Sequence, residues 1–124
     1  MHLSAFAIAL AASLAVSLTV APALAAPPAG DATAAVDLVL TLQDHRFSPS
    51  SVTVPAGRLI RIELINRDPA SEEFDSEDLR VEKDVTPHGR ARFTVGPLEP
   101  GTYSFMGELH AATASGELRA VAAP

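Results

Sequence analysis

The chain has 124 residues, a formal net charge of −6 and a hydrophobic fraction of 48%. It contains no cysteine, which excludes a disulfide framework, a cysteine-based zinc or iron–sulfur site, and a type 1 copper centre, because that centre requires a thiolate. The balance of 15 acidic to 9 basic residues argues against nucleic acid as a partner, since few cations are available to neutralise phosphates.

The first 25 residues contain no Lys, Arg, Asp or Glu and end in Ala-Leu-Ala. An apolar run followed by small residues predicts a secretory signal peptide at 1–25, cleaved after Ala25, although no Lys or Arg precedes the run. The alternative is a retained membrane anchor, because the run approaches the length of a spanning helix. The Pro/Ala/Gly-rich stretch at 26–35 favours cleavage and predicts a flexible linker. We therefore expect a periplasmic protein that contacts the membrane only through its signal segment or through a partner.

The domain is expected at 36–124, where apolar residues begin to recur at every second position. This alternation is clear in 36–42, 58–65 and 90–95, and Pro- and Gly-containing turns separate such segments. Short alternating segments at this spacing, without a helical window, predict an all-β sandwich of seven or eight strands.

The segment from Asn66 to Asp84 is the least periodic and the most acidic, with eight carboxylates and three basic residues. One interpretation is a solvated loop that keeps the protein soluble. The other is that two or three of its carboxylates converge on a cation, because like charges held close together need a counter-ion.

Two stretches, Phe47–Asp68 and Pro100–Leu118, resemble the opening and closing elements of cupredoxins. The first contains a Phe-x-Pro segment, a Gly turn and a strand that ends in Asn-x-Asp, and the second contains Pro-Gly-x-Tyr-x-Phe before His110. The resemblance implies a cupredoxin-like Greek-key β-sandwich over nearly the whole domain.

The copper ligands of that family are largely replaced in this chain. The cupredoxin pattern places its Cys at Gly107, its axial Met at Ala114 and its first His at Glu72, so that only His110 keeps a copper ligand. We therefore do not expect the electron-carrying copper function of that family.

A closer resemblance is to the EfeO-type cupredoxin-like domains of bacterial iron-uptake systems, over 72–76, 79–83, 107–110 and 113–116. It implies a periplasmic metal-binding protein that works beside an inner-membrane iron permease. If the chain shares this fold, the loops after Asn66 and Phe105 lie side by side and bring the candidate metal ligands together. These ligands are Glu72, Glu73, Glu82, Glu108 and His110.

Carboxylate oxygens with one imidazole make a hard, mixed site that suits iron, manganese or Cu(II) and suits Cu(I) poorly. Glu108 and His110 are two residues apart and would point the same way on extended backbone, whereas Glu72 and Glu73 would alternate, so that only one of those two coordinates. The resemblance favours iron, with copper or manganese as alternatives.

Several alternatives stay open at this stage. Glu82 fits a salt bridge as well as it fits a metal site, and His45 is interpreted as a surface residue, with a second, exposed metal site as the lesser alternative. A metal-free β-sandwich that serves as a periplasmic interaction module is the second functional hypothesis. No Ser–His–Asp set, phosphate loop or HExxH motif is present, so we do not expect an enzyme, and no motif supports the ferroxidase-like alternative.

Overall fold

The computed structural model of the protein describes residues 15, 17, 21 and 34–123. The predicted signal segment at 1–25 and linker at 26–35 lie outside this part of the chain, apart from residues 15, 17, 21, 34 and 35. Cleavage after Ala25 therefore stays a prediction. Within the described residues, no helix has both the length and the apolar character needed to cross a membrane.

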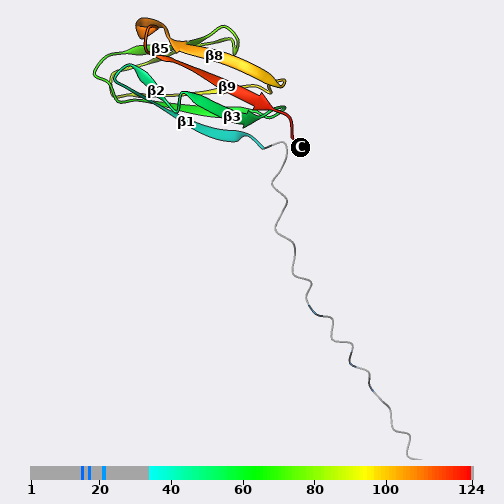
Figure 1. Ribbon diagram of the computed structural model, residues 1–124. Helices are drawn as coiled ribbons and strands as arrows, with labels where there is room; N and C mark the ends of the chain where they lie inside the picture. Colours follow the sequence, from blue (N-terminus) through cyan, green and yellow to red (C-terminus); the bar gives the residue numbers. More distant parts are fainter. Residues whose placement is uncertain (1–14, 16, 18–20, 22–33, 124) are drawn as a thin grey trace, which may run out of the picture.

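The described residues form nine β-strands in two sheets, with one short 3₁₀ helix (Figure 1). The first sheet has the order β2-β1-β4-β7, and the second has the order β3-β9-β8-β5-β6. The elements are β1 (Val36–Gln43), β2 (Arg46–Ser48), β3 (Ser51–Pro55), β4 (Ile60–Asn66), β5 (Glu72–Ser76), β6 (Val81–Val85), β7 (Arg90–Val95), β8 (Gly101–Gly107), η1 (Glu108–His110) and β9 (Ser115–Val121). The predicted all-β sandwich is confirmed, with nine strands in place of the expected seven or eight.

Strand alternation explains how the two sheets pack. In β4, Ile60, Ile62 and Leu64 face inward and are almost completely buried, while Arg61 points outward and is exposed. Burial of such side chains is the main stabilising contribution in a domain without disulfides, at about 1.5–3 kcal/mol per large apolar side chain. Phe74 packs against Phe105 at the centre of this core, with 5.0 Å between the ring centroids.

The acidic segment at 66–84 is not a loop, as one interpretation had it. β5 lies inside the second sheet, between β8 and β6, and Phe74 is 0% exposed. The strand was hard to recognise because two of its inward residues, Glu72 and Ser76, are polar and interrupt the apolar period. Both are nevertheless buried.

Three segments that are distant in the sequence meet at one end of the sandwich. η1, drawn in orange in Figure 1, lies at the same end as β2 and the start of β5. The pairing of Phe74 with Gly107 places the start of β5 beside the end of β8, and η1 follows directly. The parallel pairing of β1 with β4 sets Leu42 opposite Asn66, so the turn after β1 lies beside the residues that follow β4.

Candidate metal site

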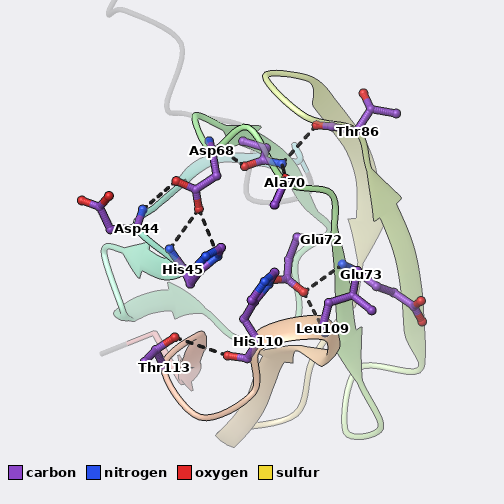
Figure 2. Close-up of polar contacts among 11 residues, drawn as sticks. Asp44, His45, Asp68, Ala70, Glu72, Glu73, Thr86, Leu109, His110 and Thr113 are labelled. Atoms are coloured by element: carbon purple, nitrogen blue, oxygen red, sulfur yellow. Dashed lines mark hydrogen bonds and ion pairs between the residues drawn. The ribbon is translucent and has the colours of Figure 1, made fainter.

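Two imidazoles and one buried carboxylate converge at this end of the sandwich (Figure 2). His45, Glu72 and His110 each offer one potential ligand atom, and these three atoms all lie within 4.8 Å of one another. The rings of His45 and His110 are stacked, with 3.7 Å between their centroids and 14° between their planes. A cluster of two imidazoles and a carboxylate is a donor set that first-row divalent metal ions bind.

Glu72 is the most buried member of the cluster, at 1% exposed. Its Oε1 atom accepts hydrogen bonds from the backbone N–H groups of Leu109, at 2.9 Å, and Glu73, at 3.1 Å. Its Oε2 atom lies 2.6 Å from Nδ1 of His110. A buried carboxylate needs such partners, because an uncompensated charge in the interior is unfavourable. These contacts hold the carboxylate at the site in one orientation.

His110 is placed by the tight turn that follows β8. η1 spans Glu108–His110, and the backbone carbonyl of His110 accepts hydrogen bonds from Ala114 N at 2.9 Å and Thr113 N at 3.1 Å. This turn directs Leu109 N and the His110 ring toward the same Glu72 carboxylate.

The space beside Gly107, where a side chain would begin, is occupied by Glu72. A Cβ atom at position 107 would lie 2.6 Å from Cδ of Glu72 and 2.9 Å from Cβ of Ala114. These are the positions where the cupredoxin pattern carries its Cys, its first His and its Met. The residues present therefore do not fit a type 1 copper centre: the sulfur ligands are missing, and Glu72 and Ala114 lie too close for a side chain at position 107 without rearrangement.

His45 lies in the two-residue loop between β1 and β2, where Gln43 pairs with Arg46. The φ angles of Asp44 and His45 are 52° and 56°, which is the φ pattern of a type I′ hairpin turn. The Asp68 carboxylate accepts hydrogen bonds from the backbone N–H groups of both residues, at 2.7 and 2.9 Å. Burial raises the pKa of Asp68, but these two N–H groups, together with the charges of His45 and His110, hold the pKa below its ordinary value.

The structure brings two of the five predicted ligands together and separates the other three. Glu72 and His110 lie in the cluster, whereas Glu73 and Glu82 lie on the outer face of β5 and β6. The reason is strand alternation, which turns Glu73 away from Glu72. Glu108 does not share the side of His110 as expected for extended backbone, because the two residues lie in a 3₁₀ helix.

Glu73 and Glu108 instead contact each other on this outer face. The hydrogen bond with Glu108 raises the pKa of Glu73, and burial and the charges of Glu108, Asp84 and Glu82 raise it further. These four residues give the outer face of β5 and β6 a concentrated negative charge, separate from the buried cluster.

His45 is the member of the cluster that the sequence interpretation missed. It was assigned to the surface, but the structure places its ring in a stack with His110. A signal was present: in a two-residue turn between strands, an Asp is ordinarily followed by Gly, and here it is followed by His. An unfavourable residue at such a position indicates a role in function.

The chain belongs to the cupredoxin-like domain family, whose profile it matches over residues 7–120. It is also 41% identical over 81 residues to the uncharacterized protein RP394 of Rickettsia prowazekii (strain Madrid E), and the matched part is 65% of each chain. The chain therefore spans about two thirds of the length of that relative.

Solved structures with the same fold include copper proteins of several kinds. The metal-binding domain of the Cu(I)-exporting P-type ATPase CopA from Streptococcus pneumoniae D39 is 14% identical, with a TM-score of 0.61, covering 72% of this chain and 97% of that one. The blue copper protein auracyanin A from Chloroflexus aurantiacus is 13% identical, with a TM-score of 0.61, covering 71% and 100%. A multi-copper oxidase from Pseudomonas thermotolerans is 12% identical, with a TM-score of 0.61, covering 74% of this chain and 31% of that one. At these identities the similarity establishes a cupredoxin-like fold and nothing further.

Proposed function

We propose that the protein binds a divalent metal ion at His45, Glu72 and His110 and carries it in the periplasm. The observation that carries this proposal is the convergence of two imidazoles and a buried carboxylate within 4.8 Å. No such arrangement is needed to stabilise a sandwich whose core is apolar, and buried polar groups of this kind concentrate at functional sites.

The donor set narrows the choice of metal. Two nitrogen donors and one oxygen donor suit Cu(II), Zn(II) and Fe(II), and the intrinsic affinity of such sites is highest for Cu(II). A pair of His with one carboxylate is also the ligand set of non-haem Fe(II) sites. We propose iron as the cargo in the cell, supported by the EfeO-type resemblance, and Cu(II) as the tightest ligand in vitro. Manganese, a third candidate from the sequence, is a weaker fit to two imidazoles.

A role in metal delivery is a separate part of the proposal. We propose that the protein is not an enzyme but captures the ion and delivers it to an inner-membrane iron permease. The acidic outer face formed by Glu73, Glu82, Asp84 and Glu108 supports capture, because a concentrated negative potential raises the local concentration of cations. Such an effect weakens as the salt concentration rises.

Equilibrium titration of the purified protein with Cu(II), Fe(II), Mn(II) and Zn(II) tests the site. The variants His45→Ala, Glu72→Gln and His110→Ala should each lose more than the roughly 10–100-fold in affinity that changes outside a ligand shell cause. His88→Asn is the matched control, because His88 is an exposed histidine outside the cluster and Asn tolerates its positive φ of 54°. If the three variants bind as tightly as the wild type, the proposed site is wrong.

The transport role needs a separate test. Iron uptake by cells that contain the protein and its permease should fall when the protein is deleted and should not be restored by Glu72→Gln. Unchanged uptake on deletion would refute the delivery role and leave the binding site standing.

The metal-free interaction module is the second candidate, and one contact favours it. Oε2 of Glu72 and Nδ1 of His110 lie 2.6 Å apart, so each gives the other a polar partner within the protein. This candidate predicts that the protein binds none of the four metals at micromolar concentration, so the same titration separates the two functions.

A further inference from the structure

The turn that carries His45 has a backbone conformation that a bulky L residue rarely adopts. Both Asp44 and His45 have φ values in the left-handed region, at 52° and 56°. The first position of such a turn accepts Asp readily, whereas the second strongly prefers Gly. His45 therefore keeps this conformation only because its surroundings determine it.

The Asp68 side chain holds the turn in this conformation. It is 5% exposed, and its two carboxylate oxygens accept the N–H groups of Asp44 and His45, one each. Its Oδ2 atom also lies 3.5 Å from Nδ1 of the His45 ring. That Nδ1 atom is buried and makes no hydrogen bond within the described part of the chain. At this distance the Asp68 carboxylate forms an ion pair with the His45 ring when the ring is protonated. Figure 2 shows Asp68 above the His45 ring and His110 below it.

Asp68 is itself anchored to the framework of the sandwich. Its backbone N–H donates to Oδ1 of Asn66 at 3.0 Å, and Asn66 is 1% exposed at the end of β4. The side-chain amide of Asn66 donates to the carbonyl oxygens of Ala70, at 2.8 Å, and Thr86, at 3.1 Å. A continuous set of hydrogen bonds thus runs from β4 through Asn66 and Asp68 to the turn.

We propose that Asp68 is the positioning residue of the metal site: it clamps the Asp44–His45 turn and thereby fixes the His45 imidazole against that of His110. This inference rests on the proposed metal-binding function. A carboxylate on one nitrogen of a metal-binding imidazole sets the orientation of the ring and leaves the other nitrogen to the metal. With Nδ1 turned toward Asp68, Nε2 of His45 is the atom that would bind the ion.

The test uses Asp68→Asn and Asp68→Ala in the full chain, first without metal. In the wild type, NMR should show cross-relaxation between the ring protons of His45 and His110, because their rings are 3.7 Å apart. We expect Asp68→Ala to lose this contact. Asp68→Asn should weaken it, because Asn keeps one carbonyl oxygen for one of the two N–H groups. The asparagine variant also decides the question if the alanine variant does not fold.

The matched control is Asp78→Asn. Asp78 likewise accepts a backbone N–H group, that of Ser104 at 2.8 Å, but lies in the second sheet's β5–β6 connection. It should lower stability without changing the contact between the two rings. This control separates positioning of the ring from a general loss of stability.

With Cu(II) bound, Asp68→Ala should lose roughly 10–100-fold in affinity, and its electron paramagnetic resonance spectrum should show one fewer coupled nitrogen than the wild type. The proposal is overturned if the ring contact persists in both Asp68 variants, or if affinity and spectrum are unchanged in them. If the wild type binds no metal, the proposed function is refuted. The NMR contact between the His45 and His110 rings, measured without metal, still tests the positioning role of Asp68 in that case.

Discussion

The Oε2 atom of Glu72 lies 2.6 Å from the Nδ1 atom of His110, which joins the start of β5 to the helix that follows β8. The Glu72 side chain is 1% exposed and that of His110 is 29% exposed, so the contact is largely shielded from water. The same carboxylate also accepts two backbone N–H groups through Oε1. One side chain thus organises both the local structure and the proposed ligand set.

The Glu72–His110 contact should contribute measurably to stability in the metal-free protein. We expect His110→Ala to lower the free energy of unfolding by about 1–3 kcal/mol, because it removes a partner from a buried carboxylate. Urea unfolding of the two single variants and of the double variant Glu72→Gln/His110→Ala gives the coupling energy, expected at about 0.5–3 kcal/mol. Additive effects of the two changes would show that the contact contributes nothing.

Gly107→Ala should disturb the site more than its one added methyl group suggests. The new Cβ atom would lie 2.6 Å from Cδ of Glu72, so the carboxylate has to move. Overpacking of this kind costs about 1–3 kcal/mol of unfolding free energy, and we expect metal affinity to fall with it. Titration calorimetry with Cu(II) measures the second effect.

Gly57→Ala provides the comparison for that variant. Gly57 has a φ of +76° with nothing within 4 Å of an added Cβ, so its substitution strains the backbone without touching the site. It should lower stability and leave metal affinity unchanged. Equal losses of affinity in the two glycine variants would contradict the role given to Gly107.

His45 should show a conflict between stability and binding. His45→Gly and His45→Ala both remove the imidazole, but glycine relieves the left-handed backbone at φ 56°. We expect the glycine variant to be more stable than the alanine variant by about 1 kcal/mol in thermal or urea unfolding, with equal loss of metal binding. If alanine is the more stable replacement, the turn is not strained in the way described.

The sequence predicts the sandwich well where inward positions are apolar, as in β4 with Ile60, Ile62 and Leu64. The prediction is less successful at β5. There the inward positions include the polar residues Glu72 and Ser76, so the apolar alternation that marks a buried strand is missing. Local pattern is least reliable where a buried residue serves a site, since its chemistry opposes its burial.

The same reasoning explains which part of the site was found. Glu72 and His110 follow from the family pattern, but the contribution of His45 depends on the parallel pairing of β1 with β4. That pairing brings the Asp44–His45 turn to Asp68, and no spacing in the sequence reports it. Alternation already predicted that only one of Glu72 and Glu73 coordinates. Glu82 was grouped with the site because charge alone does not reveal on which face of a strand a residue lies. Glu108 was grouped with it because extended backbone was expected where the chain forms a 3₁₀ helix.

Two glutamates should titrate on opposite sides of their ordinary pKa of 4.5. The hydrogen bond from Arg92 lowers the pKa of Glu63, burial opposes it, and the charges of Arg92 and Arg90 lower it further. The hydrogen bond with Glu108 raises the pKa of Glu73. Carboxyl chemical shifts followed by NMR during an acid titration measure both values, and a Glu73 pKa at or below that of Glu63 would contradict the contacts on the outer face.

These shifts give opposite dependences of stability on pH. Because the folded-state pKa of Glu63 is depressed, its stabilising contribution is present above 4.5 and is lost as the pH falls through the folded value. Because that of Glu73 is raised, its ionisation disfavours the folded state at neutral pH, and this penalty disappears as the pH falls through its folded value to below 4.5. Glu73→Gln should therefore raise the unfolding free energy at neutral pH and leave it unchanged in acid, whereas Glu63→Gln should lower it at neutral pH alone. Urea unfolding at both pH values checks the two signs, and a destabilising Glu73→Gln at neutral pH would show that the Glu73–Glu108 contact favours the charged form.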